Sequence, residues 1–139
     1  MRKILSVILL SAVFVFCSFA EIGGDDTNGD GKDDRWIVSE GGIITEVRID
    51  RDYDGRVDYL TIYDENFKKI EERLDYNFDG EMDDFYFYKA DSMYRREIDT
   101  NFDGKVDIWV YLDGVYIEKY EKDTDFDGKV DLTEDYTED

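Results

Sequence analysis

The chain contains no histidine and no proline, and its single cysteine, Cys17, lies in an apolar stretch near the start. Histidine is the commonest general base and the usual ligand of zinc and copper, so its absence argues against those sites. A lone cysteine cannot form a disulfide within the chain.

Basic residues are also scarce, because 17 Lys and Arg face 37 Asp and Glu, for a net charge of -20. Such a charge opposes binding to nucleic acid and to anionic membranes. Disorder would require few aromatic residues and low hydrophobicity. The 11 Tyr, 9 Phe and 2 Trp argue against it, and 139 residues are enough for one small domain.

One nine-residue pattern, D-x-[DN]-x-D-G-x-x-D, occurs five times. The copies start at Asp26, Asp50, Asp75, Asp99 and Asp123, at intervals of 24, 25, 24 and 24 residues. Asp, Asn and Gly favour turns, but a turn needs one or two of them rather than four oxygen-bearing side chains at fixed spacing. The pattern therefore predicts five ligand-bearing loops.

The spacing suits calcium, a hard cation that takes six to eight oxygen ligands from alternate residues of a tight loop. Positions 1, 3, 5 and 9 offer side-chain oxygens, position 7 offers its carbonyl, and the glycine at position 6 permits a sharp turn. The loops are predicted to bind up to five Ca²⁺ ions. The predicted ligands are Asp26, Asn28, Asp30, Lys32 and Asp34; Asp50, Asp52, Asp54, Arg56 and Asp58; Asp75, Asn77, Asp79, Glu81 and Asp83; Asp99, Asn101, Asp103, Lys105 and Asp107; and Asp123, Asp125, Asp127, Lys129, Asp131 and Glu134.

These loops resemble the EF-hand loop and its wider DxDxDG kin, which include thrombospondin type 3 repeats, dockerins and the strand-loop-strand sites of integrin-type propellers. The EF-hand loop also has Glu at position 12, and only the last copy has one, Glu134. The first four copies are closer to the propeller type, where an Asp at position 9 completes the coordination between two strands. The resemblance covers the loops and not the segments between them.

The loops concentrate negative charge, because eighteen carboxylates occupy ligand positions. Each pair of like charges within a few ångströms costs on the order of 1 kcal/mol near a surface. Without metal the loops should splay apart, so metal binding and folding should be coupled.

The segments between the loops read as β-strands, since they are β-branched and aromatic runs that end in turn signals. Lys68–Leu74 has helical propensity, but its counterpart Ile43–Ile49 is β-branched, so we expect a strand there too. The predicted fold is all-β, with antiparallel β-hairpin repeats of about 24 residues forming an elongated meander or solenoid and the calcium loops along one edge. An open sheet, a closed barrel and a solenoid all fit the pattern.

Two columns of apolar residues recur with the repeat, and we expect them to stack on one face and bury a continuous core. A carbohydrate-binding platform is the less favoured interpretation of the same aromatic residues. The columns are Trp36, Leu60, Phe85 and Trp109, and then Val38, Ile62, Phe87 and Tyr111.

The chain divides into a signal peptide (1–20), a linker (21–25) and the five-copy calcium-binding β-repeat domain (26–139). Arg2 and Lys3 precede an apolar run, and Ser18 and Ala20 suit cleavage before Glu21. The expected location is secreted, periplasmic or cell-surface, with no transmembrane span after signal removal. A lipoprotein anchored at Cys17 is less favoured, because a small residue is expected before such a cysteine and Phe16 stands there.

The sequence predicts an exported calcium-binding repeat protein with a structural or interaction role and no enzymatic activity. Its expected partners are calcium ions, together with an extracellular protein or an acidic polysaccharide, and not nucleic acid. The alternative is a carboxylate-based extracellular hydrolase, which would need two carboxylates facing each other across a cleft.

Overall fold

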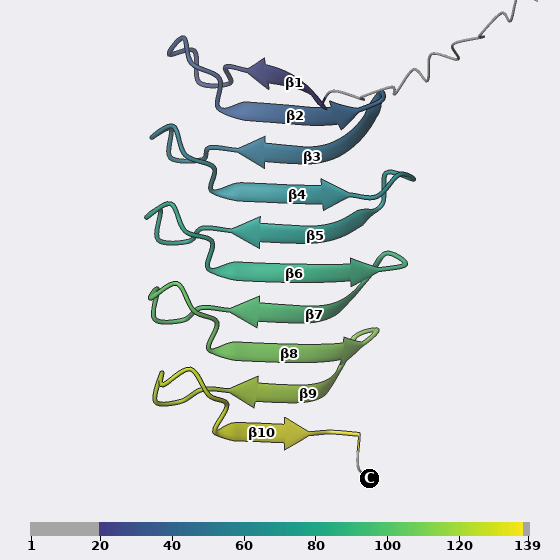
Figure 1. Cartoon of the computed structure of the whole chain (residues 1–139), viewed down its shortest axis with the longest axis vertical. Helices are drawn as coiled ribbons and strands as arrows, with labels where there is room; N and C mark the ends of the chain where they lie inside the picture. The colour runs from purple at the N-terminus through teal and green to yellow at the C-terminus, as the bar shows by residue number, and fades with distance from the viewer. Residues whose placement is uncertain (1–19, 138–139) are drawn as a thin grey trace, which may run out of the picture.

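A computed structural model describes residues 20–137, which form one open, single-layer sheet of ten antiparallel strands in chain order (Figure 1). The all-β prediction is confirmed, and the architecture is a meander that does not close. The predicted signal peptide lies outside the described residues, except for Ala20. Within them, no helix is long and apolar enough to cross a membrane.

The strands are short and alternate in direction. They are β1 (Ala20–Asp25), β2 (Arg35–Glu40), β3 (Ile43–Ile49), β4 (Tyr59–Tyr63), β5 (Lys69–Leu74), β6 (Asp84–Lys89), β7 (Ser92–Ile98), β8 (Ile108–Asp113), β9 (Tyr116–Lys122) and β10 (Leu132–Asp135). The segment with helical propensity is therefore β5, as expected. Hydrogen-bonded pairing with β4 and β6 on either side outweighs the helical propensity of this segment.

The repeat is visible in the geometry, because all five nine-residue loops lie along one edge and the short turns lie along the other (Figure 1). Each of the four hairpins also has a β-bulge at an equivalent residue. The bulged residues are Thr45, Ile70, Tyr94 and Glu118. The one 25-residue interval is explained by a longer turn at Asp64–Lys68, where the amide of Phe67 bonds to the carbonyl of Asp64.

The predicted linker is wrong, because residues 21–25 belong to strand β1 and pair with β2 from Asp25–Arg35 to Ala20–Glu40. Pairing satisfies backbone groups of β2 that would otherwise form the sheet edge. Gly24 also permits the close approach of a loop side chain, since a Cβ there would lie 1.9 Å from Oδ2 of Asp33. Glycine thus serves here as a strand residue that leaves room for its neighbour.

The predicted continuous core is also wrong. Val38, 5% exposed, is the one buried apolar side chain in the described part of the chain, and the rest of both columns is half-buried. A single sheet has no second layer to cover its faces. The side chains that are fully buried are aspartates instead: Asp58, Asp75, Asp84, Asp107 and Asp123.

One face of the sheet, which we call the ion-pair face, alternates apolar and charged strands. Strands β2, β4, β6 and β8 present the two predicted columns there. Each intervening strand presents one ion pair between residues two apart, and the cross-strand register places these pairs beside the columns. The pairs are Glu46–Arg48, Glu71–Arg73, Arg95–Glu97 and Lys119–Glu121.

The opposite face has a polar network around Glu72. This carboxylate accepts hydrogen bonds from the hydroxyls of Tyr59 and Tyr88 and from Nζ of Lys69, the last at 2.7 Å. Burial, followed by the hydrogen bond to Glu72, raises the pKa of both tyrosines above 10.0. Burial alone would raise the pKa of Glu72, but the bonds from Lys69 and the two tyrosines lower it overall.

This network predicts a late alkaline titration. Because the folded-state pKa of Tyr59 and Tyr88 is raised, their contribution to stability is fully present below pH 10.0 and is lost as the pH rises through the folded-state values. Glu72→Gln should lower the pKa of both tyrosines, because the neighbouring negative charge is lost. Tyrosinate absorbance during a pH titration measures this. An unchanged titration in the variant would contradict the network.

Candidate metal centres at the loop edge

The loop between β3 and β4 shows how the pattern folds. Both oxygens of Asp50 accept backbone amides, from Tyr53 and Gly55, each at 2.7 Å. Asp58 accepts the amides of Arg51 and Asp52 at 2.5 and 3.2 Å. The first and ninth residues therefore bind the loop backbone from opposite sides and draw it into a compact ring.

The same bonds recur along the edge. Position 1 accepts the amide of the position-6 glycine in every loop, at 2.8, 2.7, 2.7, 2.7 and 2.6 Å in chain order. Position 9 accepts the amide of position 2 in every loop, at 2.9, 2.5, 2.7, 2.8 and 3.2 Å. The repeated sequence pattern therefore gives the same two hydrogen bonds in all five loops.

The loop backbone takes positive φ at positions 4 and 6. Position 6 is always glycine, but position 4 is aromatic in four loops, where Tyr53, Phe78, Phe102 and Phe126 have φ between 61° and 66°. A bulky residue in this region costs of order 1 kcal/mol or more. The carboxylate–amide bonds hold the backbone there, and the guanidinium of Arg51 lies 5.7 Å from the centre of the Phe78 ring.

The aspartates at positions 1 and 9 form a continuous buried row. Each is at most 3% exposed, and the row comprises Asp34, Asp50, Asp58, Asp75, Asp83, Asp99, Asp107 and Asp123. One backbone hydrogen bond links each loop to the next, because the position-1 amide donates to the preceding position-9 carbonyl at 2.7–2.8 Å. Only the outermost members, Asp26 and Asp131, are exposed.

In the part of the chain that the structure describes, no basic side chain forms an ion pair with this row. The ion pairs within the loops involve position 5 and position 7 instead. They are Arg56–Asp54, Lys105–Asp103 and Lys129–Asp127. A buried carboxylate is costly unless its charge is compensated, so the row lacks a counter-charge from the described protein.

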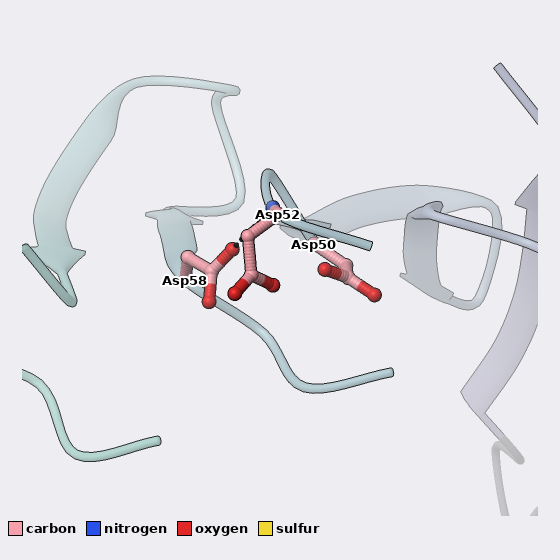
Figure 2. Close-up of side chains that lie close together, drawn as sticks. All are labelled: Asp50, Asp52 and Asp58. Carbon is pink, nitrogen blue, oxygen red and sulfur yellow. Dashed lines mark hydrogen bonds between the residues drawn. The ribbon is translucent and has the colours of Figure 1, made fainter. Parts of the chain in front are cut away.

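Two loops bring three carboxylates to within metal-binding distance. Oxygens of Asp50, Asp52 and Asp58 lie within 4.8 Å of one another, and Figure 2 shows these side chains grouped inside the loop. Asp123, Asp125 and Asp127 form a second group in the last loop, at positions 1, 3 and 5 rather than 1, 3 and 9. Position 3 is Asn in the other three loops, where an amide oxygen would take the place of one carboxylate.

The first loop contains a cavity. Its volume is about 20 Å³, which is enough for one water molecule or ion, and it extends to Asp50, Tyr53 and Gly55 of the second loop. Four predicted ligands of the first copy line it: Asn28, Asp30, Lys32 and Asp34.

Neighbouring carboxylates influence one another's pKa values. Partial desolvation by its neighbours raises the pKa of Asp52, the amide of Asp54 opposes this, and the charges of Asp54, Asp58 and Asp50 raise it further. In the third loop, burial together with the charges of Asp75 and Asp79 raises the pKa of Asp83, despite two backbone amides that lower it. A cation among these groups would relieve the repulsion.

Two parts of the predicted ligand set stay predictions. In the first four loops the position-7 residues donate their amides to the position-5 carboxylate. Their carbonyl oxygens, which are the predicted ligand atoms, stay a prediction. Glu134 lies in β10 opposite Tyr120 and accepts the hydroxyl of Tyr136, and it is not part of the triad in its loop.

Position 2 is a contributor that the sequence analysis missed. Thr27, Thr100 and Thr124 donate their hydroxyls to the position-9 aspartate of their own loops at 2.6, 2.8 and 2.8 Å. The Thr27 hydroxyl is the main cause of the lowered pKa of Asp34. The recurrent Asp-Thr dipeptide in three copies was the available signal.

Comparison with known proteins adds a fold likeness only. No protein family and no curated protein matches the chain. One similar solved structure is described as the crystal structure of accessory secretory protein 1,2 and 3 in Streptococcus pneumoniae, with a TM-score of 0.51 and 13% identity over 64% of this chain and 17% of that chain. The molecule is thus an all-β protein, a single-layer meander with acidic clusters suited to metal ions.

Substitution of a position-9 aspartate should destabilise the fold most where that aspartate is buried. Asp58→Ala would leave the amides of Arg51 and Asp52 without an acceptor, and each such loss costs about 1–3 kcal/mol. Asp58→Asn keeps an oxygen acceptor and should cost less. Asp131→Ala is the matched control, because it changes the same loop position at an exposed site. Thermal unfolding at one saturating Ca²⁺ concentration measures all three, and equal losses for Asp58→Ala and Asp131→Ala would contradict this account.

Proposed function

We propose that the loops bind Ca²⁺, in up to five sites, and that these ions stabilise an exported, non-catalytic repeat module. The observation that carries the proposal is the row of eight buried aspartates without a basic partner in the described chain. All of them lie in the loops whose spacing matches calcium ligation.

The chemistry of the donor set favours calcium over other cations. Every proposed ligand is an oxygen, and the chain contains no histidine, which opposes zinc and copper. Flexible coordination by six to eight oxygens suits a nine-residue loop, whereas Mg²⁺ demands near-ideal octahedral geometry and usually keeps several waters. A divalent ion also offsets two buried charges at once.

A structural role follows from how little else holds the sheet together. The faces are half-exposed and Val38 is the one buried apolar side chain of the described part, so the loop edge contains most of the fully buried groups. Extracellular calcium modules bind at about 0.1–1 mM. Sites of that affinity fill outside a cell and stay empty inside it, so folding would follow export. An extracellular protein or an acidic polysaccharide could then complete an ion's coordination at the exposed rim.

The hydrolase alternative has less support. Asp84 is a fully buried carboxylate outside the loops, but Arg96 binds both of its oxygens at 2.9 and 2.6 Å, and the Tyr86 hydroxyl adds a bond at 2.9 Å. A carboxylate held in this way is occupied by structural bonds rather than free for acid–base chemistry.

A calcium titration of the chelated protein tests the proposal directly. Far-UV circular dichroism and tryptophan emission should rise cooperatively with Ca²⁺, and equal concentrations of Mg²⁺ should have little effect. Trp36 and Trp109 both report, because each lies two residues after a buried position-9 aspartate. A flat response from a protein that is already folded would mean that the loops are turns held by carboxylate–amide bonds alone.

Substitution at position 3 tests the ligand assignment. Asp52→Ala removes a member of the second-loop triad and should weaken calcium binding at that loop by about tenfold or more. Asp52→Asn is the matched control, because Asn occupies the same position in three other loops and should be tolerated. Isothermal titration calorimetry measures both. If Asp52→Ala binds as many ions as the wild type with the same affinity, Asp52 is not a ligand.

A further inference from the structure

The ion-pair face is uncovered, and it is hollowed in two places. One hollow of about 330 Å³ lies over β3, β4 and β5, and its lining includes Glu46, Arg48 and Arg73. A second, of about 270 Å³, is lined by Ile22, Trp36, Arg48, Gly55 and Val57. The hollows adjoin half-buried apolar columns, and apolar patches rimmed by polar residues mark interaction sites.

Each of the four ion pairs on this face is neutral, although the chain as a whole has a net charge of -20. The order of cation and carboxylate along the strand differs between β3 and β5 on one hand and β7 and β9 on the other. In β3 and β5 the cation, Arg48 or Arg73, lies nearer the loop edge, because it pairs with Leu60 of the column beside the loops. In β7 and β9 the order is reversed, with Glu97 and Glu121 nearer the loops.

A half-turn centred midway between the two charged residues of a strand exchanges the positions of its cation and its carboxylate. When two copies meet face to face across a two-fold axis along the length of the sheet, each strand lies over its own counterpart in reverse. Arg48 then faces Glu46 of the second copy, and Glu46 faces its Arg48, and the other three pairs match in the same way. The apolar columns fall on apolar columns.

We propose that a second copy of this chain covers the ion-pair face through this two-fold arrangement. The contact is isologous, as in most homodimers. Within one copy, Arg95 packs against the aromatic side chains of both neighbouring strands, because its guanidinium lies 5.6 Å from the ring centres of both Phe87 and Tyr111. In the dimer each cation lies beside at least one aromatic side chain of a neighbouring strand and near two carboxylates, one from each copy.

A two-fold axis parallel to the strands would also match the charges, since it places β3 over β9. That arrangement brings the two acidic loop edges to the same side of the dimer, about 10 Å apart, the usual spacing of stacked sheets. This is close to the Debye length of about 8 Å at physiological ionic strength, so the repulsion would be felt. The lengthwise axis places the loop edges on opposite sides.

The face is large enough for a stable dimer. Ten strands at ~4.8 Å spacing and about 20 Å in length present roughly 900 Å². A standard interface buries about 800 Å² per partner.

Charge exchange within one strand tests both the dimer and its axis. Arg48→Glu places two acids opposite two acids and should weaken the dimer by about tenfold or more, because like-charge contacts at an interface are costly. The double exchange E46R/R48E swaps the cation and the carboxylate of β3 in both copies. The dimer with its two-fold axis along the length of the sheet should therefore form with nearly wild-type affinity. Arg35→Glu makes the same charge change on the other face and should leave the dimer intact. Sedimentation equilibrium over a range of protein concentrations measures the dimer constants, and circular dichroism confirms folding.

Three outcomes would overturn the proposal. These are a monomeric wild type that is folded and calcium-saturated, a dimer that Arg48→Glu leaves unchanged, and a folded E46R/R48E variant as weak as Arg48→Glu, which would reject the lengthwise axis. The E71R/R73E exchange in β5 repeats the test if the β3 variants do not fold. Measurements with calcium and with chelator separate this proposal from calcium binding, because a folded apo protein can dimerise without occupied loops.

Discussion

The carboxylate–amide hydrogen bond at the loop edge is the interaction on which the rest of this structure depends. In each repeat the first aspartate accepts the glycine amide and the ninth accepts the amide of position 2. These bonds fix where one strand ends and the next begins, and the position-9 carbonyl then receives the amide of the following loop. The register of the sheet is therefore set from its edge, without a packed core. The same bonds gather eight carboxylates into a buried row that has no basic partner in the described chain.

A sheet built in this way has two unsatisfied requirements, one electrostatic and one apolar. The loop edge needs positive charge, and a hard divalent cation fits its oxygen ligands. The ion-pair face is uncovered, and its four neutral ion pairs match a second copy in the proposed dimer. The two features reinforce each other, because charge neutralised at the loops would lower the repulsion between copies that meet through the ion-pair face.

The repeat period made much of the fold predictable. Four oxygen-bearing positions in a fixed pattern located all five loops, and β-branched and aromatic runs located the strands between them, including β5, where propensity favoured a helix. Two predictions failed for a common reason. The linker became strand β1 because the neighbouring edge of β2 offered hydrogen bonds, and the expected core stayed half-exposed because no second layer exists. Both depend on what lies next to a segment in space rather than on the segment itself.

By itself, the sequence determined the chemistry of this protein: oxygen ligands at a fixed period, a strong negative charge, no histidine and strands of alternating character. Local patterns can do this because turn geometry and strand periodicity are properties of a few adjacent residues. The tertiary structure decided that the sheet stays open, that positions 1 and 9 are buried except at the two ends of the row, and that the four ion pairs lie on one face beside the apolar columns. These features arise from contacts between repeats: the loop bonds set the cross-strand register at the edge, and the bulge in each hairpin shifts it once.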